Sequence, residues 1–217
     1  CIRAGSPPCP STWRSSRTSR AIISTTSNDT DEDPYTFTVE GLGYDGTSIL
    51  SHRGVNLCGA EFGQDHLPGV YGTHYIYPDT DTTDYFLAKG MLTVRLPFRW
   101  ERIQQTLYGS LDTYELARLH TAVDTITSGG GYVILDPHNF AAYHGDIIGS
   151  AEVPQNAFAD LWARLAAEFS ADDRVFFGLM NEPHDIQATT WLAAANAAIQ
   201  SFRNAGADNL ILVPGTN

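Results

Sequence analysis

Five short apolar runs, rich in Val, Ile and Leu, recur about every 40 residues along the chain, a spacing typical of strand–helix–strand units. Short apolar runs bounded by turn signals are typical of strands that are buried on both faces. The five runs span residues 53–59, 92–98, 132–139, 175–183 and 209–217. The sequence therefore predicts a largely parallel sheet at the centre of the fold.

Amphipathic segments with helix punctuation lie between these runs. Helices are predicted at residues 83–89, 112–129, 156–169 and 189–206. Asp112 and Asn156 are expected as N-caps, and Gly129 and Gly206 as helix stops. Strand and helix alternating at this period indicate parallel strands joined by right-handed crossovers, an α/β class of fold.

Two architectures are compatible with this alternation. A five-stranded doubly wound sheet would be complete at 217 residues, whereas an eight-stranded (β/α)8 TIM barrel needs about 250 and would hold only its first five strands here. A dinucleotide fingerprint places its glycines between a strand and a helix. Gly129, Gly130 and Gly131 instead follow a predicted helix, so they indicate a helix stop. Neither a Gly-x-Ser-x-Gly elbow nor a His-Glu-x-x-His motif is present.

The first 33 residues differ in composition from the rest. They hold four arginines among mostly Ser, Pro and Thr, and end in four acids within residues 28–33. This composition predicts a disordered or non-native tail or linker at 1–33, followed by one domain at 34–217. A small hairpin is expected at the start of that domain, with residues 36–39 pairing with 48–50.

Charge limits the classes of partner. Thirteen Lys and Arg against 25 Asp and Glu give a formal net charge of −12, so nucleic acid and anionic membranes are not expected as partners. No window reaches the roughly 20 apolar residues of a membrane helix, and no signal peptide is visible. Three cysteines and seven histidines show no metal-ligand spacing, so neither a metal nor another cofactor is expected.

Polar residues follow successive apolar runs at their C-terminal ends. Arg95 interrupts the second run, His138 and Asn139 end the third, and Asn181 and Glu182 end the fourth. In a barrel, the C-terminal ends of the strands share one rim, and the active site lies there. The sequence therefore predicts a catalytic cluster at this rim.

Three stretches carry a family resemblance, which runs from about residue 53 to residue 217. "RLPFRWERIQ", "HNFAAYHGDIIG" and "FFGLMNEPHDI" resemble glycoside hydrolase family 5, the retaining (β/α)8 glycosidases, and most closely its endo-β-1,4-glucanase (cellulase) branch. The resemblance implies an endo-acting hydrolase of β-1,4-glucans such as cellulose and carboxymethyl-cellulose. Two alternatives stay open: a β-mannanase or other β-1,4-glycanase of the same family, and an inactive or carbohydrate-binding half barrel.

The resemblance also implies roles for four residues. Glu182 would be the general acid that protonates the leaving oxygen and then the base that activates water. Asn181 would bind the 2-hydroxyl of the reacting sugar. Arg95 would orient and ionise the nucleophilic carboxylate, and His138 would bind sugar hydroxyls.

Aromatic residues in loops after the strands can stack on pyranose rings. Trp100, Tyr143 and Phe62 occupy such positions, and Trp100 and Tyr143 are expected to bind substrate. Asp136 lies two residues before His138 on the same strand, and is interpreted as a carboxylate that orients its neighbours.

One departure from the family pattern concerns the nucleophile. The family's nucleophilic glutamate lies on a seventh strand, and this chain is expected to reach only the fifth. We therefore expect an incomplete reading frame of a secreted cellulase, poorly soluble and inactive by itself, and a monomer if the full barrel is present. Secretion is inferred from the polymeric substrate, because a polymer cannot enter a cell.

Overall fold

The structure is a computed structural model that describes residues 18–25, 35–42 and 52–216. The chain divides into two compact units, Cys1–Leu50 and Ser51–Asn217. The larger unit contains the five predicted strands and all the described helices.

The smaller unit contains a two-stranded antiparallel sheet. Strand β1 (Thr18–Thr25) pairs with β2 (Tyr35–Leu42). The predicted strand at 36–39 lies within β2, but its partner is β1, inside the segment whose composition predicted a tail. Residues 48–50, the expected partner, lie outside the described residues. β1 was not predicted because the average composition of residues 1–33 does not reveal a short stretch rich in the β-branched residues that favour strands. The division of the chain at residue 33 stays a prediction.

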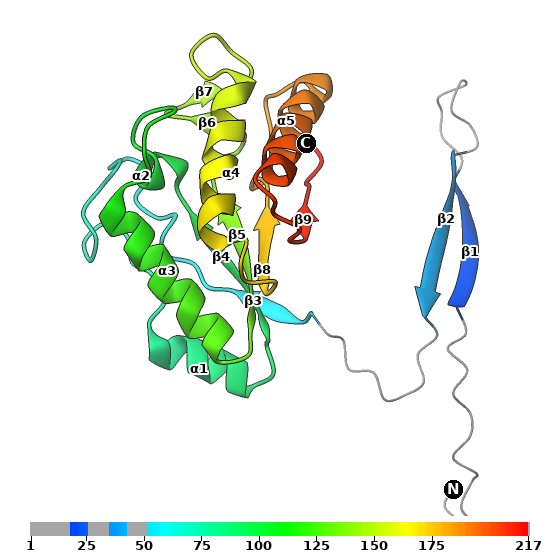
Figure 1. The fold of residues 1–217 in the computed structure, drawn as a ribbon, viewed down its shortest axis with the longest axis horizontal. Helices are drawn as coiled ribbons and strands as arrows, with labels where there is room; N and C mark the ends of the chain where they lie inside the picture. The colour runs from blue at the N-terminus through cyan, green and yellow to red at the C-terminus, as the bar shows by residue number, and fades with distance from the viewer. Residues whose placement is uncertain (1–17, 26–34, 43–51, 217) are drawn as a thin grey trace, which may run out of the picture. The chain divides into compact units, whose positions relative to one another are not determined.

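The larger unit is built on a five-stranded sheet with parallel neighbours throughout. Its strands lie in the order β3-β4-β5-β8-β9, which is also their order along the chain (Figure 1). A doubly wound sheet reverses its strand order near the middle, and this sheet has no reversal. The order confirms the expected partial (β/α) barrel. The strands are Gly54–Asn56 (β3), Thr93–Phe98 (β4), Tyr132–Pro137 (β5), Val175–Gly178 (β8) and Ile211–Leu212 (β9).

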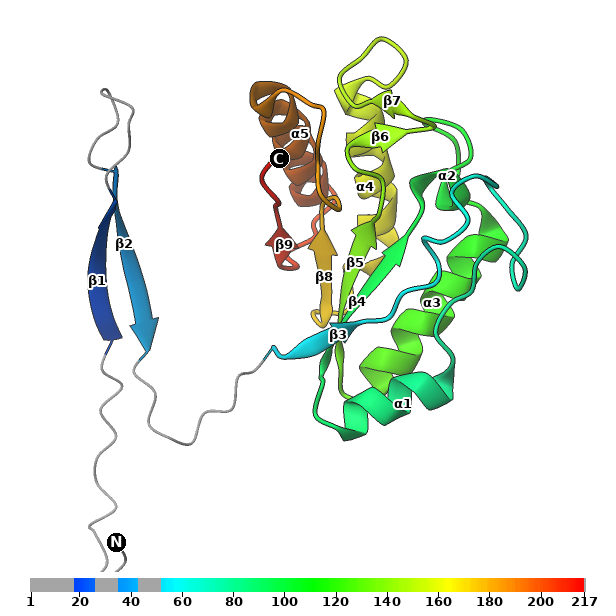
Figure 2. The same ribbon diagram turned by 180° about the vertical axis from the view of Figure 1, so that it is seen from behind.

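Helices follow the strands along the chain and cover one face of the sheet. Figures 1 and 2, which view the molecule from opposite sides, place α3, α4 and α5 over the same face. The short strands β6 (Ala142–Tyr143) and β7 (Asp146–Ile147) form a hairpin in the loop after β5. The helices are Thr80–Ala88 (α1), Trp100–Ile103 (α2), Thr113–Ser128 (α3), Gln155–Phe169 (α4) and Ala188–Asn204 (α5).

Helix caps explain most of these boundaries. The Asp112 side chain accepts hydrogen bonds from the N–H groups of Tyr114 and Glu115, and Gly129 is the C-cap of α3, as predicted. The expected Asn156 cap is wrong, because α4 already begins at Gln155 and its N-cap is Pro154. Proline has a fixed φ that suits a helix start, and no side-chain cap is present at this end.

The core lies between the sheet and its helices. The fully buried side chains on the helix-covered face are Val94, Leu96, Val133, Leu135 and Phe177, and the ring of Phe177 contacts Trp162 of α4. Aromatic rings from α4 and α5 pack against this face of the sheet. The ring of Phe202 stacks on that of Phe177 with 4.8 Å between ring centroids, and the centroid of the Trp162 ring lies 5.0 Å from that of Phe202. Burying a large apolar side chain stabilises a fold by about 1.5 to 3 kcal/mol, so this face supplies much of the stability of the unit.

The other face of the sheet carries the alternate residues of the same strands. Arg95, Tyr132 and Ile134 are partly exposed there. His52 contacts the ring of Tyr132 edge-on at 4.9 Å and that of Phe176 at 5.3 Å. This face leads to the C-terminal ends of the strands, where the polar residues of the predicted site lie.

Candidate active site

Three neighbouring strands bring together an arginine from the middle of β4, an aspartate near the C-terminal end of β5 and an asparagine just after β8. Arg95 on β4 donates from Nη2 to Oδ2 of Asp136 on β5, at 2.8 Å. The same nitrogen donates to Oδ1 of Asn181, which follows β8, at 2.5 Å. Because side chains alternate between the faces of a strand, Arg95 and Asp136 leave the sheet on the face opposite the helices. The predicted convergence of these strand ends is therefore present.

Asp136 is the centre of this cluster. Its side chain is only 5% exposed, and Oδ2 also lies 3.3 Å from Nδ1 of His138. A carboxylate only accepts hydrogen bonds, so Nδ1 of His138 carries the hydrogen in this contact. Nε2 of a neutral His138 is then an acceptor. The geometry agrees with the interpretation that Asp136 orients its neighbours.

Glu182 lies beside this cluster with its side chain exposed. The preceding N–H, that of Asn181, donates to the carbonyl of Pro137 at 2.9 Å, which ties the end of β8 to the end of β5. Glu182 itself has φ 39°, in the left-handed region that non-glycine residues rarely adopt. Such backbone strain occurs often at functional sites, where the surrounding structure maintains it.

A cavity of about 440 Å³ borders these residues. Polar groups from Arg95, Asp136, Asn181 and Glu182 line one part of it. Apolar residues line the rest: Ile134, Met180, Ile211, Leu212, Val213 and Pro214. We call this space the catalytic cavity.

Two predicted substrate contacts lie elsewhere. Trp100 is fully buried at the start of α2, where its Nε1 donates to Oε1 of Gln104 at 2.8 Å. Tyr143 is 6% exposed, packs on Trp100 at 4.8 Å between ring centroids, and donates to the carbonyl of Gln104 at 2.9 Å. Both rings are buried by the protein, so neither presents a face on which a sugar could stack. Phe62, in the loop after β3, is 55% exposed.

Burial changes the acidity of the Tyr143 hydroxyl. Burial, and to a smaller extent the nearby Glu101 carboxylate, together raise the pKa of its hydroxyl to about 12. The neutral hydroxyl is therefore strongly favoured, which suits a hydrogen bond that anchors the loop after β5.

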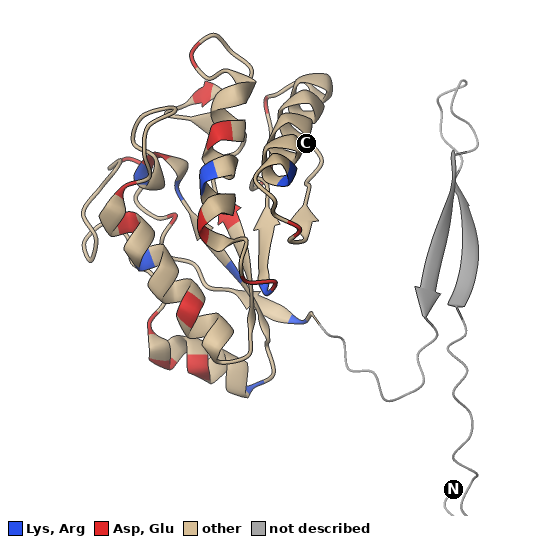
Figure 3. Ribbon diagram, viewed as in Figure 1, with Lys and Arg blue, Asp and Glu red and all other residues tan. Residues whose placement is uncertain are grey.

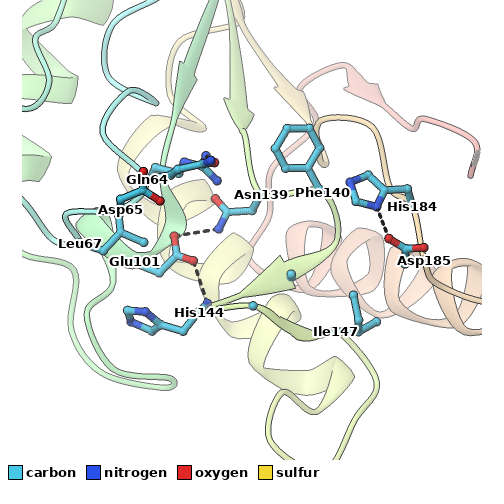
Figure 4. Close-up of a pocket in the computed structure, with 13 residues that line it drawn as sticks. Gln64, Asp65, Leu67, Glu101, Asn139, Phe140, His144, Ile147, His184 and Asp185 are labelled. Atoms are coloured by element: carbon cyan, nitrogen blue, oxygen red, sulfur yellow. Dashed lines mark hydrogen bonds and ion pairs between the residues drawn. The ribbon is translucent and has the colours of Figure 1, made fainter.

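Glu101, whose carboxylate is buried, was not among the site residues predicted from the sequence. Its Oε2 accepts from Nδ2 of Asn139, and its Oε1 accepts from the N–H of His144, both at 2.8 Å (Figure 4). Oδ1 of Asn139 in turn accepts from the N–H of Trp100 at 2.9 Å. A charged residue directly after a buried strand was the available signal. Glu101 and Asn139 join the loops after β4 and β5.

Arg102 fixes a third loop. It donates to the carbonyl oxygens of Ala60, Phe62 and Pro68 in the segment after β3, and its guanidinium lies 4.0 Å from the centroid of the Tyr75 ring. Burial lowers the pKa of this guanidinium, although an arginine stays charged in proteins. The loops that surround the strand ends are therefore held by buried polar groups.

The described residues include no group of three or more His, Cys, Asp and Glu side chains arranged to hold a metal ion. Among the helices of the described part of the chain, none has the length and apolar character needed to cross a membrane.

Known proteins resemble this chain in sequence and in fold. Residues 50–217 match the family model described as cellulase (glycosyl hydrolase family 5). A probable endo-β-1,4-glucanase B of Neosartorya fischeri is 40% identical over 172 residues, which cover 78% of this chain and 51% of that protein. Endoglucanase 1 of Saitozyma flava is 40% identical over 181 residues, covering 79% and 52%.

Solved structures give the same result. An endo-β-1,4-glucanase from Xanthomonas axonopodis pv. citri has a TM-score of 0.76 and 50% identity, over 77% of this chain and 53% of that one. XacCel5A, solved in complex with cellopentaose, has a TM-score of 0.76 and 48% identity, over 78% and 54%. The chain spans about half the length of the curated relatives it matches. Since the family model covers most of the chain, the protein belongs to glycosyl hydrolase family 5.

Proposed function

We propose that this chain carries the acid/base half of a retaining endo-β-1,4-glucanase site, with Glu182 as the general acid and base. The observation that carries the proposal is the contact of Arg95, Asp136 and Asn181 at three neighbouring strand ends, directly beside Glu182. In a retaining glycosidase, one carboxylic acid protonates the leaving oxygen and later activates water. Glu182 is exposed to the catalytic cavity, so a glycosidic oxygen can reach it.

Asn181 is positioned to bind the reacting sugar. Its Oδ1 accepts from Arg95, and this contact fixes the orientation of the amide. The Nδ2 donors are then free for a sugar hydroxyl, because an amide carries its two donors on the nitrogen. We assign Nδ2 of Asn181 to the 2-hydroxyl of that sugar, a hydrogen bond that strengthens in the transition state.

We assign His138 to a sugar hydroxyl and Arg95 to the nucleophilic carboxylate. Asp136 holds Nδ1 of His138, so Nε2 accepts a hydrogen bond from a second sugar hydroxyl. Arg95 is partly exposed and uses only Nη2 in its contacts with Asp136 and Asn181. Its remaining N–H groups can bind the nucleophilic carboxylate of the retaining mechanism, which must lie about 5 to 5.5 Å from the acid. We propose that this carboxylate is supplied by a later strand of the barrel.

The names of the relatives support β-1,4-glucan as the substrate, and the complex of XacCel5A with cellopentaose supports an extended, uncharged chain. Acidic side chains are spread over α1, α3 and α4 (Figure 3), and a net charge of −12 disfavours anionic polysaccharides. Secretion follows from the proposal, because an insoluble polymer must be cleaved outside the cell.

The test is hydrolysis of carboxymethyl-cellulose by this chain co-expressed with the C-terminal half of the Xanthomonas endoglucanase. Glu182→Gln is expected to lower kcat by at least about a hundredfold, because the amide cannot donate a proton to the leaving oxygen. Asp124→Asn, at an exposed acid on α3 that lines no cavity near the strand ends, serves as the matched control.

Hydrolysis retained in Glu182→Gln would refute the acid/base assignment. Faster cleavage of mannan than of glucan by the same complex would replace the proposed substrate. Cellulose binding without turnover in the unaltered complex would favour a carbohydrate-binding half barrel.

A further inference from the structure

The chain that follows His138 takes a strained path. Phe140 has φ 56°, Ala141 has φ 64° and His144 has φ 49°, all in the left-handed region that residues with a side chain rarely adopt. We call residues 139–144 the strained loop. A backbone of this kind persists only where the surrounding structure holds it in place, so groups outside this path must fix it.

The carboxylate of Glu101 holds both ends of the strained loop (Figure 4). Its Oε2 accepts from Nδ2 of Asn139 at 2.8 Å, and its Oε1 accepts from the N–H of His144, also at 2.8 Å. Glu101 is 4% exposed and Asn139 is 3% exposed. Oδ1 of Asn139 accepts from the N–H of Trp100 at 2.9 Å, so three hydrogen bonds attach the loop to α2.

The strained loop begins directly after His138, and one of its side chains returns to that residue. The N–H of His138 donates to the carbonyl of Phe98 at 2.7 Å. Two side chains contact its ring. Oδ2 of Asp136 lies 3.3 Å from Nδ1, and the ring of Phe140 meets it edge-on with 5.2 Å between centroids. Because the place of Phe140 depends on the left-handed backbone, the hydrogen bonds of Glu101 determine where this ring meets His138.

A buried carboxylate is an unusual link between two loops, because removing a charge from water carries a large free-energy penalty. A carboxylate offers two oxygens that only accept hydrogen bonds, and here they match two donors on either side of Phe140 and Ala141. Hydrogen bonds to a charged acceptor are also stronger than neutral ones. The arrangement therefore fits a side chain that fixes the geometry of the loop.

We propose that Glu101 is a positioning residue for His138. Its two hydrogen bonds maintain the strained loop, the loop places the ring of Phe140 against the imidazole, and the imidazole keeps Nδ1 at Asp136. Nε2 is then left as an acceptor. The use of Nε2 in the reaction, as an acceptor for a sugar hydroxyl, rests on the proposed function, whereas the orientation of the ring does not.

Glu101→Gln tests this proposal, because it keeps the shape of the side chain and converts one acceptor into a donor. Whichever way the amide turns, its NH₂ group faces either Nδ2 of Asn139 or the N–H of His144. NMR spectra of the ring nitrogens, recorded on the 217-residue chain at a pH where His138 is neutral, distinguish the two tautomers. The ratio of Nδ1–H to Nε2–H in His138 is expected to fall about threefold or more in this variant. Comparison with His138→Gln identifies the signals.

The double variant Glu101→Gln/Asn139→Asp restores the three hydrogen bonds with donor and acceptor exchanged. The new amide at position 101 donates to the new carboxylate at position 139 and accepts from the N–H of His144, while that carboxylate accepts from the N–H of Trp100. The tautomer ratio is expected to return to within about twofold of its native value. Asn139→Asp alone turns two carboxylates toward each other, and is expected to lower the ratio at least as much as Glu101→Gln.

Glu152→Gln is the matched control, since it makes the same change at an exposed glutamate before α4, and it is expected to leave the ratio unchanged. Catalysis gives a second measurement. In the complex with the C-terminal half of the Xanthomonas endoglucanase, Glu101→Gln is expected to lower kcat on carboxymethyl-cellulose about tenfold. The double variant is expected to recover most of this loss.

Unchanged tautomers in Glu101→Gln would overturn the proposal, even if this variant unfolds at a lower urea concentration, because Glu101 would then contribute to stability alone. If Glu101→Gln does not fold, the double variant decides. Native tautomers in the double variant would support the proposal, whereas an altered ratio or a failure to fold would overturn it.

The two proposals fail separately. Tautomers of His138 that depend on Glu101, together with hydrolysis that survives Glu182→Gln, would refute the catalytic assignment and support the positioning role. Hydrolysis lost in Glu182→Gln, with His138 unchanged in Glu101→Gln, would refute the positioning role alone.

Discussion

The two faces of the five-stranded sheet differ in what their side chains contact. On the face under α3, α4 and α5, Leu96 and Leu135 are fully buried among apolar neighbours. On the opposite face, Arg95 and Ile134 from the same strands remain partly exposed, and Arg95 forms an ion pair with Asp136. Alternation along each strand therefore gives the sheet one tightly packed face and one partly exposed polar face, so a substitution can be directed at either.

The largest expected effect is the difference in unfolding free energy between substitutions at two neighbouring residues of β5 that lie on opposite faces of the sheet. Leu135→Ala is expected to lower the free energy of unfolding by about 2 to 5 kcal/mol, because it leaves a cavity in a packed core. Ile134→Ala is expected to lower it by about 1 kcal/mol, since only part of that side chain is buried. Urea denaturation of both variants measures the difference, and equal losses would contradict the assignment of the core to the helix-covered face.

A smaller effect on the free energy of unfolding is expected at Asp136, on the face of the sheet opposite the helices. Asp136→Asn removes the charge that Arg95 and His138 share, and is expected to lower the free energy of unfolding by roughly 1 to 3 kcal/mol. The control is Glu168→Gln, an acid-to-amide change at the exposed pair with His120, for which a change within about 0.5 kcal/mol is expected. Urea denaturation at neutral pH measures both. A loss for Asp136→Asn no larger than the control would mean that this cluster adds nothing to stability.

The smallest effect concerns Tyr143, which sequence reasoning placed on the functional side. The pKa of its hydroxyl is raised from an ordinary value of 10.0 to about 12 in the folded protein. Between these pH values, the unfolded state therefore loses a proton that the folded state keeps. The free energy of unfolding is therefore expected to fall as pH rises from 10 to 12. Tyr143→Phe is expected to cost about 1 kcal/mol at pH 7, through loss of one hydrogen bond, and to flatten this fall. An identical pH dependence in Tyr143→Phe would show that other groups cause it.

The period of apolar runs was enough to predict the sheet, because each run must be buried and each intervening helix must return the chain to the same edge. Polar residues at the ends of those runs predicted the cluster of Arg95, His138 and Asn181 for the same reason. The hydrogen bonds that fix the cluster depend on side-chain rotamers and on strand register, and neither is encoded in spacing along the chain.

Residues whose chemistry suits two roles could not be assigned from sequence. An aromatic ring after a strand can stack on a sugar or pack beneath a loop, and Trp100 and Tyr143 do the second. Phe140, whose ring lies beside that of His138, gave no separate signal because its placement depends on a left-handed backbone. Asn156 resembles a cap, yet the helix begins one residue earlier, after Pro154.

The strands of the five-stranded sheet lie side by side in the order in which they occur along the chain. This order has a consequence for biosynthesis. Within the five-stranded sheet, each strand from β4 onward docks against the strand of that sheet made before it, so the sheet can be assembled one strand–helix unit at a time as it leaves the ribosome. Domains generally fold as units during synthesis, N-terminal parts first. The contacts among Arg95, Asp136 and Asn181 can therefore form as soon as β8 has emerged, before any later strand is translated.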